Sequence, residues 1–183
     1  MCEQIIIEQC SPTLAGIKTA NLFSCDCKNK QNLLNEIRAF NKKFSQKGLL
    51  MMPIRFFNDK ALIYLYRPEK LKEDLNDKCA LNLLKECGYD NADPNKCICE
   101  LINRFKNYQQ FPHEIGLFLG YPPEDVKGFI ENGAKCAKCV GCWKVYGDEE
   151  KAQKCFENYK KCTRIYKKLY SKGKPIERLA VAV

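Results

Sequence analysis

Two strand-like runs around a short polar turn constrain the fold more than any other part of the chain. Residues 49–57 and 61–66 are rich in aliphatic, aromatic and β-branched side chains, and Asn58-Asp59-Lys60 lies between them. This arrangement predicts an antiparallel hairpin. Arg67-Pro68 follows and closes it. The sequence therefore predicts a small sheet that is mainly antiparallel.

The N-terminal segment is harder to interpret, because its apolar residues follow no clear period. Residues 5–7 are three isoleucines, which fit a short strand or a buried helix turn equally well. Ser11 followed by Pro12 is typical of a helix start, with serine as the N-cap and proline in the first turn. We therefore predict a helix from Ser11 to about Phe23.

Helical patterns dominate the remaining sequence. Apolar residues recur at helical spacing after Asn29 and Asn32, which predicts a helix that begins at one of them and ends before Gly48. Further helices are predicted over about 68–87, 94–105, 112–120, 122–133 and 148–172, and a strand over 140–146. We predict a helix-rich α+β fold, organised as a single domain over 1–183 with a flexible tail over 173–183.

Composition limits the class of protein. The chain has 183 residues, of which 45% are hydrophobic, and it contains no run of about 18 apolar residues, so we expect no membrane span. Its start lacks a basic region and a long apolar stretch, which is unlike a secretory signal and favours a cytoplasmic protein. The formal net charge of +9 fits nucleic acid, an anionic surface or an acidic partner.

Three of the 13 cysteines lie in the pattern Cys136-x-x-Cys139-x-x-Cys142. This spacing fits a metal site, either an iron–sulfur cluster or zinc, with a fourth ligand from Cys155, Cys162 or elsewhere; Cys162 is the one we consider. It also fits dithiol redox chemistry, since lysines flank the thiols and would lower their pKa. Simple packing of small apolar side chains is the alternative for each cysteine.

A nucleophilic site is a further candidate. His113 is the only histidine, and a cysteine activated by histidine makes a nucleophile. Its partner could be Cys10 or a cysteine of the 136–142 run, and Cys10 and His113 are the candidate catalytic residues. A structural histidine at a helix start is the alternative, and whether the protein is an enzyme stays open.

Two segments suggest an interaction module. Residues 112–132 have the helix, Leu-Gly turn and helix of a helix-turn-helix, although the second helix presents Glu124 and Asp125 first, which would repel phosphates. The last predicted helix carries many lysines on one face, which fits a solvated surface or an acidic protein partner such as a flavodoxin. Nucleic acid ranks below such a protein as a partner.

Several motifs together resemble the DUF3793 family, an uncharacterised bacterial family of clostridia and their relatives. They are residues 10–18, 64–68, 111–122, 125–130 and 143–148, so the resemblance covers nearly the whole chain. Cys10 and Cys162 match the family pattern, whereas Cys136 and Cys139 do not. The resemblance implies membership and no activity. It also favours the segment 111–130, with 143–148 beside it, as the functional surface.

Taken together, the thiols favour an accessory protein in thiol, redox or iron metabolism that binds a metal or cofactor through cysteines. The alternative is a non-enzymatic interaction module with a basic surface, which would bind an acidic protein, or DNA through residues 112–132.

Overall fold

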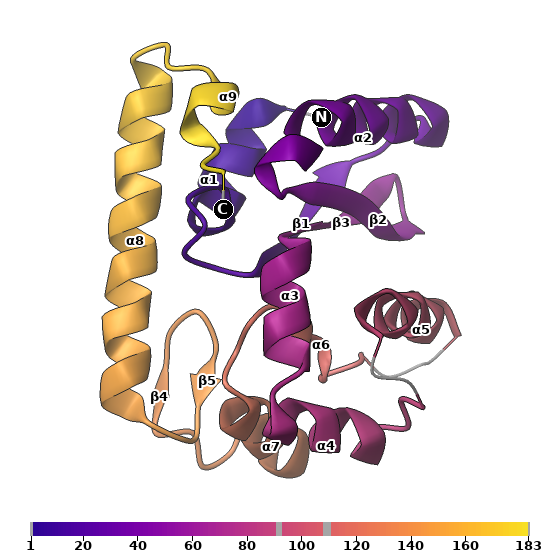
Figure 1. Cartoon of the computed structure of the whole chain (residues 1–183), viewed down its shortest axis with the longest axis vertical. Helices are drawn as coiled ribbons and strands as arrows, with labels where there is room; N and C mark the ends of the chain where they lie inside the picture. Colours follow the sequence, from indigo (N-terminus) through magenta and orange to yellow (C-terminus); the bar gives the residue numbers. More distant parts are fainter. Residues whose placement is uncertain (1, 91–92, 108–110, 183) are drawn as a thin grey trace. The chain divides into compact units, whose positions relative to one another are not determined.

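The computed structural model describes residues 2–90, 93–107 and 111–182, and it confirms the helix-rich α+β fold with a small antiparallel sheet (Figure 1). The chain folds into two compact units. Residues 1–69 together with 159–183 form unit 1, and residues 70–158 form unit 2. The single domain over 1–183 stays a prediction. Within the described ranges, no helix is long and apolar enough to cross a membrane.

Unit 1 is built on a three-stranded antiparallel sheet. Its strands are β1 (Ala20–Asp26), β2 (Leu50–Phe57) and β3 (Lys60–Tyr66), in the order β1-β3-β2. The predicted hairpin is therefore confirmed as β2 and β3. Asn58 and Asp59 both have positive φ angles, 42° and 56°, because a two-residue turn of this kind matches the twist of the strands.

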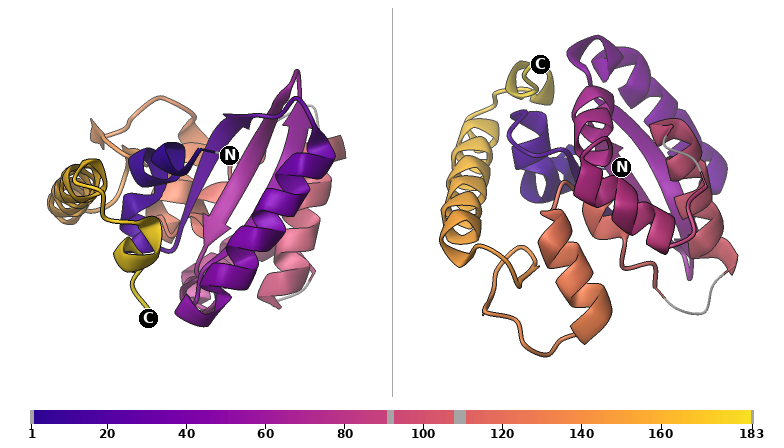
Figure 2. Two further views of the ribbon diagram at one scale, coloured as in Figure 1. Left: turned by 90° about the horizontal axis from the view of Figure 1, so that it is seen from above. Right: turned by 60° about the horizontal axis from the view of Figure 1, so that its bottom comes forward.

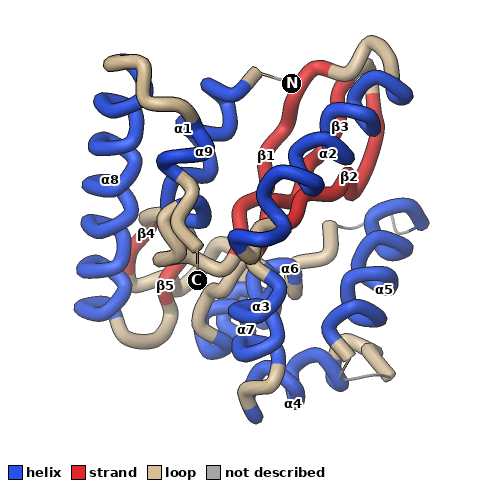
Figure 3. Tube along the Cα trace, turned by 45° about the horizontal axis from the view of Figure 1, so that its top comes forward, coloured by secondary structure: helices blue, strands red, loops and turns tan. Residues whose placement is uncertain are grey.

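Two helices of unit 1 pack against the same face of this sheet. They are α1 (Glu3–Leu14) and α2 (Lys30–Phe44), and the 3-10 helix η1 (Ser45–Lys47) follows α2 (Figure 3). Alternate residues of β3, Ala61, Ile63 and Leu65, belong to one core cluster with buried residues of both helices. Asn29 caps α2 and Gly48 has a φ of 68°, so the predicted ends of this helix are confirmed.

The N-terminal helix prediction is wrong in its bounds. Residues 5–7 lie inside α1, which runs through Pro12 and ends at Leu14, and Ala20 already begins β1. Ser11 does not cap this helix; its hydroxyl donates to the Ile7 carbonyl inside it. Residues 20–26 form a strand because they pair along the whole length of β3. The sequence of residues 20–26 alone does not predict this long-range pairing.

The C-terminal segment of unit 1 contains a short helix that packs on the core, and the flexible tail predicted over 173–183 stays a prediction. Helix α9 (Ile176–Leu179) lies beside α1, and Ile176, Leu179 and Ala180 are buried in the core (Figure 2). Lys47 donates to the carbonyls of Glu177 and Ala180, and Arg67 donates to that of Val181. Two cations from distant parts of the chain therefore hold the carbonyls of this segment.

Unit 2 is mainly helical. Its elements are α3 (Pro68–Leu75, which begins in unit 1), α4 (Lys78–Glu86), α5 (Pro94–Asn107), α6 (Ile115–Phe118), α7 (Pro123–Asn132), β4 (Cys139–Val140), β5 (Lys144–Val145) and the first part of α8 (Glu149–Ser171). The strand predicted over 140–146 is instead the two-stranded hairpin β4–β5, because a turn with a hydrogen bond from Gly141 N to the Trp143 carbonyl reverses the chain.

A buried polar cluster fixes α6 in unit 2. Glu114, at the start of α6, is 6% exposed and accepts hydrogen bonds from Tyr89 Oη at 3.1 Å and Arg104 Nη1 at 3.4 Å. The Arg104 guanidinium also lies 4.3 Å from the centre of the Tyr89 ring. Because the carboxylate and the cation are paired, this burial costs little.

Candidate functional site

The two candidate catalytic residues lie in different units. Cys10 lies in α1 of unit 1 and is fully buried in the core, and burial raises the pKa of its thiol above the usual range. His113 is exposed in unit 2, where its ring packs edge-on against Phe129 with centroids 4.8 Å apart. A buried, protonated thiol cannot reach a substrate, so the structure does not support Cys10 as a nucleophile.

The three cysteines of the Cys-x-x-Cys-x-x-Cys run surround the β4–β5 hairpin. Cys136 and Cys142 are exposed, and Cys139 packs against the small core cluster of Val145, Ala152 and Phe156. Partial burial and the nearby Glu149 carboxylate raise the pKa of Cys139, against the lowering expected from its lysine neighbours. The side chain of Cys139 therefore packs as a partly buried apolar group.

The predicted metal site stays a prediction, and its four cysteines form no cluster among the described residues. Cys162 lies on the part of α8 that belongs to unit 1, and burial raises the pKa of its thiol to about 11. Across the described ranges, which include all four predicted ligands, no three His, Cys, Asp or Glu side chains come together in a way that could hold a metal ion. Spacing in the sequence does not bring these thiols to a common point.

The lengths and contacts of α6 and α7 argue against the helix-turn-helix interpretation. Helix α6 has only four residues, and Asp125, in the first turn of α7, is buried with its carboxylate engaged by the chain itself. On the exposed side of α7, Lys127 lies within ion-pair distance of Glu86 and Glu131. This helix presents carboxylates rather than donors to a nucleic acid.

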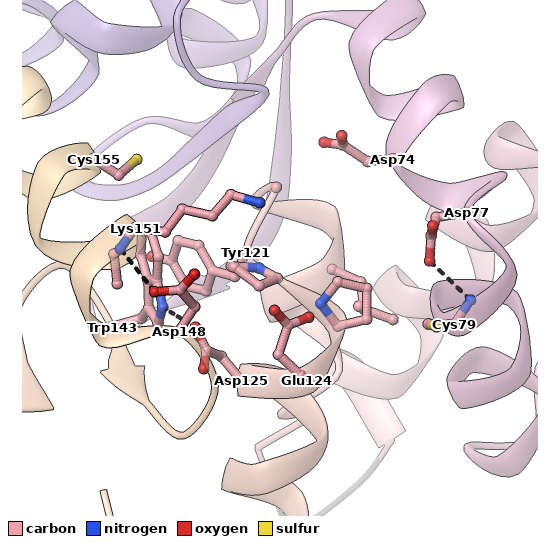
Figure 4. Close-up of a pocket in the computed structure, with 15 residues that line it drawn as sticks. Asp74, Asp77, Cys79, Tyr121, Glu124, Asp125, Trp143, Asp148, Lys151 and Cys155 are labelled. Carbon is pink, nitrogen blue, oxygen red and sulfur yellow. Dashed lines mark hydrogen bonds between the residues drawn. The ribbon is translucent and has the colours of Figure 1, made fainter. Parts of the chain in front are cut away.

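A pocket of about 500 Å³ lies in unit 2 (Figure 4). Five carboxylates line it, and they come from α3, α4, α7 and α8 or from the residues just before these helices. They are Asp74, Asp77, Glu124, Asp125 and Asp148. One ammonium group, that of Lys151, extends across the pocket above the Tyr121 ring. The lining is therefore strongly acidic.

Helix capping explains why so many carboxylates gather here. Three helices, α4, α7 and α8, begin at the pocket. Asp77 Oδ1 accepts from the N–H groups of Cys79 and Ala80 at 2.8 and 3.1 Å, and Asp148 Oδ1 accepts from Lys151 N at 3.0 Å. Acidic residues are favoured at such positions because helix N-termini carry partial positive charge. Each cap uses one oxygen of its carboxylate.

Asp125 organises the wall of the pocket. It is 3% exposed, and its Oδ2 accepts from Trp143 Nε1 at 2.7 Å while its Oδ1 accepts from the N–H groups of Tyr146 and Gly147 at 2.7 and 2.8 Å. The segment 143–148 therefore lies against α7, as the motifs suggested. Gly147 is needed for this approach, since a Cβ there would lie 2.5 Å from Glu124 Cγ.

The comparisons with known proteins give one match. The chain matches a family described as protein of unknown function (DUF3793) over residues 6–180. It belongs to this family. Searches of the curated proteins and of the solved structures found no match. Family membership fixes no activity, and the functional argument therefore rests on the pocket.

A pair of stacked rings forms the apolar part of the pocket. Tyr121 and Trp143 lie with centroids 4.7 Å apart and an interplanar angle of 27°, and Phe156 meets Trp143 edge-on at 4.5 Å. Because Asp125 also holds the indole N–H, the orientation of Trp143 is fixed from two sides. Burial raises the pKa of Tyr121 to about 12, so this ring stays neutral.

Sequence reasoning found part of this site and missed the rest. The motifs placed 143–148 beside the segment 111–130, and the predicted helix over 148–172 began at Asp148. They did not indicate that Asp74 and Asp77 would face the same space as Glu124, because the helices that carry them are far apart in sequence. The run of acids at helix starts was the available signal.

Proposed function

We propose that the protein binds a small organic cation in the pocket of unit 2. The observation that carries this proposal is the combination of five carboxylates and one ammonium around a stacked aromatic pair. A volume of about 500 Å³ lies within the range typical of sites for small molecules. The ligand class follows from the charge and from the rings.

Charge selects a cation over an anion. Three helix N-termini at the pocket contribute roughly half a positive charge each, which does not offset the excess of four carboxylates over the ammonium. The helix N–H groups are also occupied by capping carboxylates or replaced by proline, as at Pro123. An incoming anion would meet repulsion and find few donors.

The aromatic pair favours an organic cation over a metal ion. Ammonium groups over the face of tyrosine or tryptophan gain about 0.5–2 kcal/mol, depending on how far they are desolvated. Trp143 and Tyr121 are held in place before any ligand arrives, so ordering them costs little on binding. The carboxylates are spread around the pocket instead of converging on one point (Figure 4).

The role in thiol, redox or iron metabolism stays a prediction. Two thiols, Cys79 and Cys155, line the pocket, but the features that favour a ligand there are the carboxylates and the rings. Where burial or nearby charge shifts the pKa of a described cysteine, the shift is upward, as in Cys87 and Cys97. Such thiols are poor nucleophiles at neutral pH.

Trp143 allows a direct test, since it is the only tryptophan of the chain and lines the pocket. Its fluorescence is titrated with putrescine, spermidine and tetramethylammonium, and with 1,4-butanediol and succinate as neutral and anionic controls. We expect a saturable change with at least one of the cations and none with the controls. Equal responses to putrescine and butanediol, or no response to any cation, would refute the proposal.

A matched pair of variants assigns the binding to the pocket. Glu124 points its carboxylate into the pocket, and Glu124→Gln is expected to weaken binding about five- to tenfold, as for loss of one charged contact (Figure 4). Glu150→Gln, an exposed carboxylate of α8 outside the lining, makes the same chemical change and is expected to leave binding unchanged. Equal effects of the two would contradict the assignment.

A further inference from the structure

The charges of the protein are divided unequally between the two units. Unit 1 contains 18 lysines and arginines against 7 aspartates and glutamates, whereas unit 2 contains 13 against 15. Unit 1 therefore has a net charge of +11 and unit 2 a net charge of −2, which sum to the +9 of the protein. Such asymmetry is typical of a chain in which one part meets a polyanion.

The positive charge of unit 1 is concentrated on one face of α8. Between residues 160 and 168 this helix exposes four cations that, at 3.6 residues per turn, fall within an arc of about 100°, and a fifth follows directly after the helix ends at Ser171. The cations are Lys160, Lys161, Arg164, Lys168 and, after the helix, Lys172. The first four extend over about 12 Å of helix at 1.5 Å per residue.

These five side chains are not used inside the protein. Among the described residues, none of the five lies within ion-pair distance of a carboxylate, whereas Lys167, at the edge of the arc, lies 3.5 Å from Glu8. The opposite side of the helix packs on the core of unit 1 through Tyr166, Leu169 and Tyr170. The basic face is therefore held in place by the fold.

We propose that this face of α8 binds the phosphate backbone of a nucleic acid duplex. Its cations form a row along one side of the helix and its C-terminal end, and lysines act as point charges toward phosphates. The face offers no exposed ring for stacking on bases, so binding is independent of sequence. Each phosphate contact releases a counterion, which makes the binding depend strongly on salt.

An acidic protein and a membrane fit the same face less well. Protein interfaces are depleted in lysine and need an apolar centre, and the only exposed apolar residue on this face is Ile165, at 44% exposure. Helices that lie in a membrane surface need a broad apolar side that is free, but here that side is occupied by the core. Binding to phosphates requires neither an apolar centre nor a free apolar side of the helix.

The test uses the full chain and a fluorescein-labelled 20-base-pair duplex, followed by anisotropy between 50 and 200 mM salt. Five phosphate contacts give a slope of log K against log salt of about −4.5. The triple variant of Lys160, Arg164 and Lys168 to Gln is expected to bind at least tenfold more weakly at low salt. Its slope should become shallower by about 2.7.

A second triple variant separates this face from overall charge. Lys28, Lys42 and Lys60 are exposed cations of unit 1 outside α8, and their change to Gln removes the same charge. We expect this control to bind within threefold of the parent and to keep its slope. Equal losses in the two triple variants would overturn the proposal.

A polyglutamate peptide distinguishes an acidic protein partner. If the parent binds this peptide through the α8 face and does not bind the duplex, the occupant is an acidic protein and the proposal is wrong. Circular dichroism of each variant, with a spectrum equal to that of the parent, confirms that binding is compared between folded proteins.

Discussion

Replacing Arg67 with methionine removes the most heavily used buried donor of unit 1. Arg67 is 2% exposed and makes hydrogen bonds only to backbone carbonyls: those of Thr13 at 2.7 Å, Leu14 at 2.8 Å, Lys47 at 3.0 Å and Val181 at 2.8 Å. Burial lowers the pKa of its guanidinium, which shows the cost of keeping this charge away from water. The hydrogen bonds to the four carbonyls offset that cost.

The expected loss of stability follows from these contacts. Methionine fills much of the same volume but donates nothing, so four hydrogen bonds are lost at once. The Thr13 and Leu14 carbonyls keep a backbone donor, Gly16 N and Val181 N, whereas those of Lys47 and Val181 lose the donor that Arg67 supplied. Hydrogen bonds to charged groups contribute about 1.5–3 kcal/mol each, but removing the guanidinium also removes its desolvation penalty. We therefore expect a net loss of about 3–5 kcal/mol, comparable to that from removing one partner of a buried ion pair.

Urea denaturation measures this loss, with Arg55→Met as the matched control. Arg55 is an exposed residue of β2, so the same chemical change there should cost less than about 0.5 kcal/mol. Arg67→Met should also make the C-terminal segment more sensitive to carboxypeptidase, because Val181 loses its donor. A cost below 1 kcal/mol for Arg67→Met would refute the reasoning.

Three further predictions concern unit 2 and the thiols. Asp125→Ala should cost about 2–4 kcal/mol in thermal or urea unfolding and shift the emission of Trp143, since three hydrogen bonds are lost at a buried carboxylate. Gly141→Ala should cost about 1–3 kcal/mol, because its Cβ would lie 2.2 Å from the Phe156 ring. In the folded protein, Cys162 should react slowly with iodoacetamide at pH 8 and faster as the pH approaches 11. In urea, its reaction rate should instead rise around the ordinary thiol pKa. Peptide mass spectrometry measures the alkylation rate in both states.

Local signals account for the parts of the fold that the sequence predicted. The β2–β3 hairpin and α2 were found because their turn, cap and apolar periods lie within a few residues of one another. The strand β1 was missed because it is defined by its pairing with β3, forty residues later. Pro12 misled the assignment of α1. Proline is common at the start of a helix, but here it lies inside the helix, close to its C-terminal end.

Long-range contacts explain the remaining differences. The carbonyls of Glu177 and Val181 accept hydrogen bonds from Lys47 and Arg67, and no pattern near residue 176 predicts these long-range contacts. The pocket needs carboxylates from helices far apart in sequence, so its composition becomes visible only in the fold. The spacing of Cys136 and Cys142 suggested a shared metal, but Cys136 precedes β4 and Cys142 lies in the turn of the β4–β5 hairpin, and among the described residues they join no group of three possible ligands.

Unit 1 is discontinuous in sequence, since residues 70–158 interrupt it. During synthesis, the sheet and its first two helices leave the ribosome early, yet α9 and the Val181 carbonyl bound by Arg67 arrive last. The continuous unit, with its acidic pocket, has its complete sequence before the basic one. A ribosome stalled near residue 160 would therefore carry an N-terminal unit that still lacks its closing segment.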